Sequence, residues 1–386
     1  MHRSEILNHL GENREQYFHA VSPPIIQSSN FTFEGLDHFR QSFEDELKNH
    51  IYTRGNNPTV AILRKKLAAL ESAEDALVFS SGCAAISAAV IGNVKAGDHI
   101  VCVQSPYSWT YKLLTEFLQR FGVSHSFVDA RNIEAIEQAI RPNTTVLYLE
   151  SPCSITFAIQ DLRACAALAK KHGLVSIIDN SYCSPIYQRP IELGIDIVIH
   201  SGSKYLNGHS DVVVGVLCST AKMVNQIFVS EAMTLGAIVS PADAALVIRG
   251  LRTLELRLQR CDESGKKVAQ FLEKHPKIEE VIHPFLPSFP QVDLAQQQMS
   301  GCGGLFSFHL KATSIEEAEN FFKQLKRFLL AVSWGGHESL VLPFCAFYNI
   351  PGRIDSSLPW NLVRIYIGLE DPDWLIEDLN QALEAF

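Results

Sequence analysis

The chain has 386 residues, of which 47% are hydrophobic and 19% are charged, and its formal net charge is −9. This composition excludes a mainly disordered protein, because the apolar content is high and the net charge is modest. It also argues against a nucleic-acid-binding protein, which usually carries an excess of Lys and Arg. No apolar run approaches the roughly 18 residues that a membrane-spanning helix needs, so we expect no membrane partner.

Residues 1–17 carry several charges and no apolar stretch, so we expect no signal peptide. The sequence contains nine cysteines, and none stands at the spacing of a zinc site. We therefore expect reduced, mostly buried thiols in a cytoplasmic protein that holds no metal.

The predicted elements begin after an N-terminal segment, residues 1–50, which is polar and irregular and is expected to pack on another surface such as a second subunit. Apolar residues at helical spacing predict a helix over 59–70. Short apolar runs then alternate with helix-like segments, which predicts βαβ units and an α/β fold with a mostly parallel central sheet. The predicted strands are Ala76–Phe79, His99–Val103, Ser124–Val128, Thr145–Leu149, Leu174–Ile178 and Ile195–Ile199. The predicted helices between them include Tyr107–Phe121, Ile133–Ile140 and Asp161–Lys171.

A long helical pattern over Ala242–Ser264 and a group of prolines from Pro284 to Pro290 mark the end of this region. A smaller C-terminal α/β domain is expected to follow. Its elements are a strand at Gly303–Leu310, a helix at Ser314–Phe328, a strand at Leu362–Ile367 and a helix at Pro372–Phe386. Asp371 is expected to cap the last helix, because Pro is favoured in the first turn and Asp just before it.

Ligands of open α/β sheets bind beyond the carboxyl ends of the strands, and four features stand there in this sequence. Ser80-Ser81-Gly82 opens an apolar helix, which suits a phosphate. Tyr107, Asp179 and Lys204 each follow a predicted strand. Each feature alone has an ordinary interpretation as a cap, a turn residue or a solvated side chain. Together they supply a phosphate cup, a stacking ring, a carboxylate for a cationic ring nitrogen and a lysine for a Schiff base, which is what pyridoxal phosphate needs. A dinucleotide is less well supported, because the sequence has neither GxGxxG after a strand nor a P-loop.

Three motifs then identify a family. His200–Asp211 reads HSGSKYLNGHSD, Asp179–Ser181 reads DNS, and Tyr52–Thr59 reads YTRGNNPT. From about Tyr52 to the C-terminus, the chain resembles the pyridoxal-phosphate-dependent enzymes of Cys/Met metabolism. The resemblance implies the fold type I of these transferases, similar to aspartate aminotransferase. It also implies three parts: an arm over 1–54 that contributes to a neighbouring subunit, a cofactor-binding domain over 55–250 and a small domain over 251–386.

The resemblance implies the site residues as well. Lys204 would form the Schiff base and act as the catalytic base, Tyr107 would stack on the ring and assist proton transfer, and Asp179 would pair with the ring nitrogen. The implied phosphate-binding residues are Ser81, Gly82, Cys83, Ser201 and Ser203, together with Tyr52 and Arg54 of a neighbouring subunit. The implied substrate-binding residues are Arg364, Ser333, Trp334 and Tyr52. Shared sites imply a homo-oligomer, a dimer at least and typically a tetramer.

The reaction is less narrowly defined. Glu150–Thr156 and Ser333–Ser339 resemble the cystathionine β-lyase branch of the family. They favour β-elimination of a sulfur amino acid, which would convert cystathionine to homocysteine, pyruvate and ammonia in methionine biosynthesis. Tyr52–Thr59 reads more like the enzymes that act at the γ-carbon, so γ-elimination or γ-replacement is the alternative. A cofactor-binding regulator with little turnover is a third, less favoured one.

Overall fold

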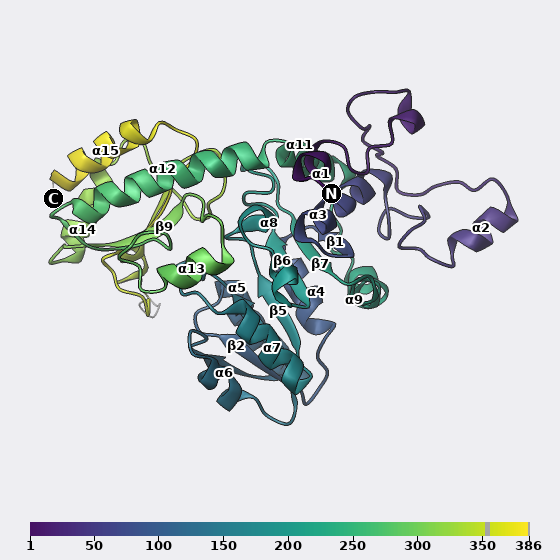
Figure 1. Cartoon of the computed structure of the whole chain (residues 1–386), viewed down its shortest axis with the longest axis horizontal. Helices are drawn as coiled ribbons and strands as arrows, with labels where there is room; N and C mark the ends of the chain where they lie inside the picture. The colour runs from purple at the N-terminus through teal and green to yellow at the C-terminus, as the bar shows by residue number, and fades with distance from the viewer. Residues whose placement is uncertain (352–355, 385–386) are drawn as a thin grey trace. The chain divides into compact units, whose positions relative to one another are not determined.

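In the computed structural model, which describes residues 1–351 and 356–384, two sheets organise the chain (Figure 1). Each sheet belongs to its own unit. Unit 1 comprises Met1–Ser151, Gln160–Asn207 and Asp211–Thr253, and unit 2 comprises Pro152–Ile159, Gly208–Ser210 and Leu254–Phe386. Two short segments, 152–159 and 208–210, therefore pack with the C-terminal part of the chain although they lie far from it in the sequence.

Among the described residues, the sheet of unit 1 has seven strands in the order β1-β7-β6-β5-β4-β2-β3. Strand β7 runs antiparallel to both of its neighbours, whereas the pairs from β6 to β3 are parallel. The mostly parallel sheet predicted from the sequence is thus confirmed, and the antiparallel β7 was missed. The strands are β1 (Asp75–Phe79), β2 (His99–Val103), β3 (Ser124–Val128), β4 (Thr144–Glu150), β5 (Val175–Asp179), β6 (Ile197–Ser201) and β7 (Gly215–Ser219).

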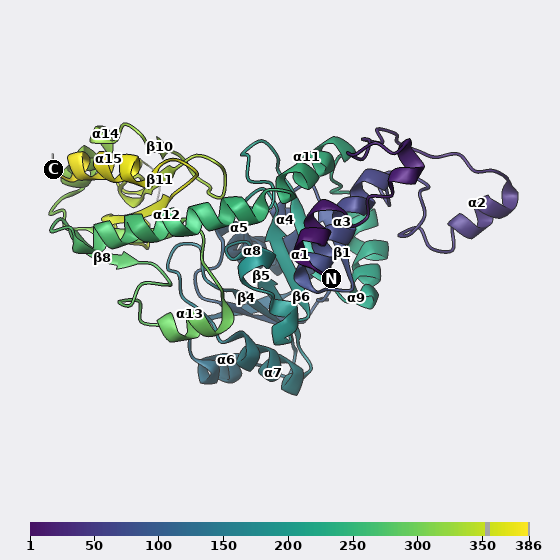
Figure 2. The same ribbon diagram turned by 45° about the horizontal axis from the view of Figure 1, so that its top comes forward.

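Several helices of unit 1 begin at capping side chains that the sequence provides. Ser81 Oγ accepts from the N–H of Ala84 at the start of α4, and Asp161 Oδ1 accepts from Ala164 at the start of α7. In both views α6 and α7 lie side by side (Figures 1 and 2). The helices are α1 (Arg3–Asn8), α2 (Leu36–Ser42), α3 (Pro58–Glu71), α4 (Gly82–Ile91), α5 (Ser108–Lys112), α6 (Ile133–Ala139), α7 (Leu162–His172), α8 (Ser184–Tyr187), α9 (Ala221–Ile227), α10 (Met233–Leu235) and α11 (Pro241–Leu251).

The first 50 residues are more regular than expected, because they contain α1 and α2. Helix α1 buries Ile6 and Leu7 and lies beside α3 (Figure 2). The buried ammonium of Lys66 in α3 donates to the carbonyl oxygens of Ile6 and Leu7 and pairs with Glu12 at 3.1 Å. These contacts of Lys66 hold the start of the chain against α3. The polar composition of the first residues did not indicate that they pack in this way.

Unit 2 has a second, smaller sheet in the order β10-β11-β12-β9-β8, and among its described strands only the pair β10–β11 is parallel. Its strands are β8 (Ile278–Ile282), β9 (Leu305–Leu310), β10 (Leu329–Leu330), β11 (Leu340–Pro343) and β12 (Leu362–Tyr366). Its helices are α12 (Leu254–Lys274), α13 (Val292–Gln298), α14 (Ile315–Gln324) and α15 (Pro372–Glu384). The expected small α/β domain is therefore present, with three strands that the sequence pattern did not reveal.

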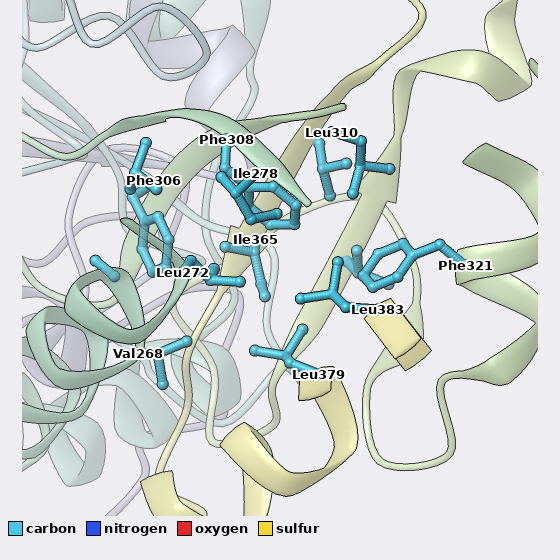
Figure 3. Packing of buried hydrophobic residues seen from close by; sticks show 14 of the residues in the cluster. Val268, Leu272, Ile278, Phe306, Phe308, Leu310, Phe321, Ile365, Leu379 and Leu383 are labelled. Carbon is cyan, nitrogen blue, oxygen red and sulfur yellow. The ribbon is translucent and has the colours of Figure 1, made fainter. Parts of the chain in front are cut away.

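The core of unit 2 lies between this sheet and its helices. Phe306 and Phe308 of β9 and Leu379 and Leu383 of α15 are fully buried in one cluster (Figure 3). Asp371 Oδ1 accepts from the N–H groups of Asp373 and Trp374, so the predicted cap of α15 is confirmed. The last two residues of the helix predicted over Pro372–Phe386 lie outside the described residues.

Two predicted helices differ in detail. The pattern over Ala242–Ser264 forms two helices, α11 and α12, because the N–H and hydroxyl of Thr253 both donate to the carbonyl of Gly250 and turn the chain. The segment Tyr107–Phe121 is helical, but a π-helical turn at Leu113–Phe117 and a 3₁₀ turn at Leu118–Phe121 follow the short α5.

Candidate functional site

The carboxyl ends of the parallel strands in unit 1 bring two carboxylates into neighbouring positions. Glu150, the last residue of β4, is paired in register with Asp179, the last residue of β5, and Asp179 is paired with Ile199 of β6. Both carboxylates are buried. Side chains at paired positions point to the same face of a sheet, so the two acids lie together at this edge.

The carboxylate of Asp179 is held by Ser181. Ser181 donates to Asp179 Oδ1 through its main-chain N–H at 2.9 Å and through Oγ at 2.5 Å. Ser181 Oγ in turn accepts from the N–H of Ser201 at 2.6 Å. Burial raises the pKa of the Asp179 carboxyl above its usual value, while the hydrogen bonds from Ser181 and the charges of His200 and Lys204 act in the opposite direction. The ionised form of Asp179 therefore depends on nearby donors and cations.

The Ser81–Gly82 turn packs directly against the end of β6. A side chain on Gly82 would place its Cβ 3.0 Å from Cβ of Ser201, and a side chain on Gly215 would collide with the carbonyl of Ser81. Gly215 stands opposite both Phe79 and Ser201 in the sheet. The two glycines thus let the first turn of α4 approach Ser201, and the amide groups of that turn have no acceptor within the helix.

Lys204 and Ser203 lie on the turn that follows β6. The N–H of Lys204 donates to the carbonyl of Ser201, and the charge of Lys204 acts on Asp179. Ser203 Oγ accepts from the N–H of Val214 at 2.9 Å and donates to its carbonyl at 3.3 Å. Ser201, Ser203 and Lys204 are partly buried. The predicted lysine therefore lies close enough for its charge to act on the predicted carboxylate.

Tyr107 lies at the same edge. Its main-chain N–H donates to Glu150 Oε2 at 2.6 Å, and its hydroxyl contacts the thiol of Cys83. Burial, the neighbouring Cys83 and the charges of Asp179 and Glu150 raise the pKa of Tyr107 to about 12. Without a nearby cation the phenol is thus protonated at neutral pH, which makes it a proton donor rather than a base.

Tyr52 and Arg54 contact each other. The guanidinium of Arg54 lies 5.3 Å from the centre of the Tyr52 ring, and both side chains are exposed in the single chain. Their predicted role at a neighbouring subunit's phosphate stays a prediction, since one chain alone is described.

The predicted substrate-binding residues belong to unit 2. Arg364 lies in the middle of β12, is 9% exposed, and donates through Nη1 to the carbonyl of Ser154 at 3.4 Å. Ser307, its register partner on β9, donates to the carbonyl of Ile155. The segment 152–159 thus lies over β9 and β12, and Arg364 contacts it.

Ser333 and Trp334 follow β10. Ser333 is exposed and has a φ of 82°, in the left-handed region that non-glycine residues rarely adopt, whereas Trp334 is buried. Because such strain clusters at ligand-binding positions, Ser333 stays a candidate on geometric grounds, and Trp334 is part of the packing of unit 2.

The residues of unit 1 fit pyridoxal phosphate. Asp179 is a buried carboxylate whose two bonds from Ser181 both go to Oδ1, which suits a further cationic partner such as a protonated ring nitrogen. The first turn of α4 suits a phosphate. Because Gly215 has no side chain, nothing from β7 collides with the Ser81 carbonyl just before this turn. The amine of Lys204 lies on the same edge, where an aldehyde could react with it.

Sequence reasoning did not assign a role to Glu150 or Ser181. A role for Glu150 could have been recognised from the sequence, because it is an acidic residue at the end of an otherwise apolar strand. Ser181 lies two residues after Asp179, a spacing at which Asp side chains commonly accept from the chain.

The part of the chain that the structure describes contains no group of His, Cys, Asp and Glu that could bind a metal ion. Within the same residues, no helix is both long and apolar enough to cross a membrane. Among the described residues, which include all nine cysteines, no disulfide is formed, and all the cysteines except Cys83 are buried, so the predicted burial of most of the thiols is confirmed.

Comparison with known proteins agrees with the family that the sequence motifs implied. The family model described as Cys/Met metabolism PLP-dependent enzyme matches residues 5–384. The chain is 38% identical to the L-methionine gamma-lyase of Treponema denticola, over 97% of this chain and 95% of that protein. It is 40% identical to the L-methionine gamma-lyase of Porphyromonas gingivalis (96% and 94%) and 40% identical to the cystathionine gamma-lyase of Homo sapiens (98% and 92%). The family's fold type I and its cofactor, pyridoxal 5′-phosphate, are the ones that the motifs implied, and the chain belongs to the Cys/Met metabolism PLP-dependent enzymes.

Proposed function

We propose that the protein is a carbon–sulfur lyase that eliminates the γ-substituent of a sulfur amino acid, with methionine and cystathionine as the first substrates to test. The observation that carries this choice is the similarity of 38–40% over nearly the whole chain to proteins named as γ-lyases. It favours the alternative of γ-elimination over the β-elimination preferred from two sequence segments.

Pyridoxal phosphate supplies the electron sink that makes the protons next to the amino group acidic. In our proposal the neutral amine of Lys204 would take the α-proton, release it within the site to become neutral again, and then take a proton from the β-carbon. The carboxylate of Asp179 keeps the ring nitrogen protonated, and burial together with the bonds from Ser181 fixes its place.

Tyr107 would give its phenolic proton to the departing sulfur. What supports this role is that Tyr107 carries its phenolic proton at neutral pH, because burial and the neighbouring acidic groups raise its pKa to about 12. Arg364 would bind the carboxylate of the substrate, for which a planar guanidinium is suited.

We further propose that the protein is a cytoplasmic homo-oligomer. The absence of disulfides among the described residues supports a reducing compartment. The exposed pair Tyr52 and Arg54 supports a site completed by a second copy.

Product analysis tests the reaction. With cystathionine as substrate, γ-elimination yields 2-oxobutyrate, ammonia and cysteine, whereas β-elimination yields pyruvate, ammonia and homocysteine. We expect 2-oxobutyrate to be the main 2-oxo acid from cystathionine and from methionine. Pyruvate as the main product would instead return the assignment to β-elimination and to the methionine-biosynthetic role implied with it.

The Lys204→Ala variant is the control for both assays. It should lose turnover and the visible absorption of the Lys-bound cofactor while its circular dichroism stays native. Cofactor absorption in the wild type without any 2-oxo acid from sulfur amino acids would favour the regulator that binds the cofactor without turnover.

A further inference from the structure

Behind the edge that carries Glu150 and Asp179 lies a further buried carboxylate, which the proposed mechanism does not use. Glu71, the last residue of α3, is 1% exposed. Its Oε1 accepts from His200 Nε2 at 2.5 Å and from Asn180 Nδ2 at 3.2 Å. His200 and Asn180 are buried as well. A buried carboxylate is costly unless it is paired and hydrogen-bonded, so this position calls for an explanation.

The two partners of Glu71 are the chain neighbours of site residues. Asn180 directly follows Asp179, and His200 directly precedes Ser201. Adjacent residues of a strand point to opposite faces, so His200 is directed to α3 while Ser201 is directed to the Ser81–Gly82 turn. One carboxylate therefore holds the ends of β5 and β6 from behind.

The front of the same two strand ends is joined by Ser181, which bonds to Asp179 and to Ser201. Between front and back, the N–H of Asn180 donates to the carbonyl of Ile199 at 2.8 Å. Asp179 is thus placed by a hydroxyl on one side and, through its neighbour Asn180, by Glu71 on the other.

The amide of Asn180 is held in addition by Gln188. Gln188 Nε2 donates to Asn180 Oδ1 at 2.9 Å and to the carbonyl of Ser151 at 3.0 Å, and Asn180 Nδ2 donates to the carbonyl of Gln188. Ser151 follows Glu150 at the end of β4. The network behind the site therefore reaches the three strand ends that carry Glu150, Asp179 and Ser201.

We propose that Glu71 is a positioning residue of the cofactor site, whose carboxylate sets the Asp179 carboxylate opposite the ring nitrogen of pyridoxal phosphate through Asn180 and His200. This inference rests on the proposed assignment of Asp179 to that nitrogen. Glu71 itself touches neither cofactor nor substrate in this scheme.

The test measures the dissociation constant of pyridoxal phosphate from the protein, by titrating the cofactor-free form and following absorbance. Glu71→Leu removes the acceptor at similar volume, and we expect the dissociation constant to rise about tenfold or more. Glu71→Gln keeps an oxygen that can accept from His200 and Asn180, so its dissociation constant should stay within about threefold of the wild type.

The double variant Glu71→Leu/Asp179→Asn separates positioning from general stabilisation. If Glu71 acts through Asp179, Glu71→Leu has little further effect once Asp179 is replaced. Equal effects of Glu71→Leu in both backgrounds would overturn the inference while leaving the assignment of Asp179 intact. A dissociation constant unchanged by Asp179→Asn would instead overturn that assignment, and the inference with it.

Two further variants complete the design. Asn180→Ala removes one of the two donors to Glu71 and serves if Glu71→Leu does not fold. Asn180→Ala should weaken cofactor binding when Asp179 is present and should have little effect when it is combined with Asp179→Asn. An equal loss of affinity in both backgrounds would count against the inference. Glu192→Leu is the matched control, because Glu192 accepts from Ser72 beside Glu71 but has a 52% exposed side chain. Its cofactor affinity should equal that of the wild type.

Discussion

Ser181 Oγ lies 2.5 Å from Asp179 Oδ1 and accepts the main-chain N–H of Ser201 at 2.6 Å. One hydroxyl therefore joins the ends of β5 and β6. Because burial raises the pKa of Asp179 and the bonds from Ser181 lower it, this hydroxyl also governs the charge that the site presents to a ring nitrogen.

The Ser181→Ala variant should weaken cofactor binding, because a hydrogen bond to a charged group contributes about 1.5–3 kcal/mol. Loss of the hydroxyl raises the pKa of Asp179 further, so the carboxylate is lost at a higher pH. The loss of affinity should therefore grow as the pH falls. Ser181→Thr, which keeps the hydroxyl, is the control. Equal affinity of Ser181→Ala and Ser181→Thr across the pH range would contradict this role.

The Gly215→Ala variant tests the close approach of β7 to the Ser81–Gly82 turn. An added Cβ would collide with the carbonyl of Ser81, so the turn must move or the strand must shift. Overpacking of this kind costs about 1–3 kcal/mol, and both the melting temperature and the cofactor affinity should fall. Gly35→Ala is the control, because a Cβ at Gly35 meets no atom within 4 Å. Unchanged affinity in Gly215→Ala would show that the turn does not form the phosphate site.

The edge of the sheet could be predicted from the sequence because its signals are local. Asp179 directly follows one apolar run and Lys204 follows another after the turn His200–Ser203, and the order of strands and helices places the ends of these strands at one edge. The antiparallel β7 escaped prediction because its pairing depends on contacts distant in sequence, with β1 and β6. Glu71 escaped it for a similar reason, since it meets His200 and Asn180 only when α3 packs on the sheet. Helical spacing predicts a helix over 59–70, which stops one residue before Glu71 and does not indicate the partners of Glu71.

Tyr107 should remain protonated well above the ordinary tyrosine pKa of about 10. Its pKa of about 12 means that the folded state retains the phenolic proton more tightly than the unfolded chain. The stability from this group is thus complete below about pH 10 and declines as the pH rises towards 12. Phenolate absorbance of the cofactor-free protein, compared with Tyr107→Phe, measures the ionisation. A difference spectrum with a midpoint near pH 10 would contradict the raised pKa.

Arg364→Ala should raise KM for sulfur amino acids by about tenfold or more, with a smaller change in kcat. The guanidinium is removed from a buried position in β12, and a substrate carboxylate would lose its cationic partner. Arg364→Lys keeps the charge but not the planar fork, so an intermediate KM is expected. Steady-state kinetics with both variants make the comparison. A KM equal to that of the wild type in Arg364→Ala would exclude the carboxylate-binding role.

Mixed oligomers test whether Arg54 serves a neighbouring site. Lys204→Ala should be inactive because it lacks the amine. Arg54→Ala should be nearly inactive because it lacks a contact to the phosphate of the cofactor. If the site combines Lys204 of one copy with Arg54 of another, a mixed pair has one site with both residues intact and one with neither. Exchanging subunits of the two variants should therefore restore activity that neither has alone. Oligomers proved to be mixed by differential tagging, yet still inactive, would place Arg54 outside the neighbouring site.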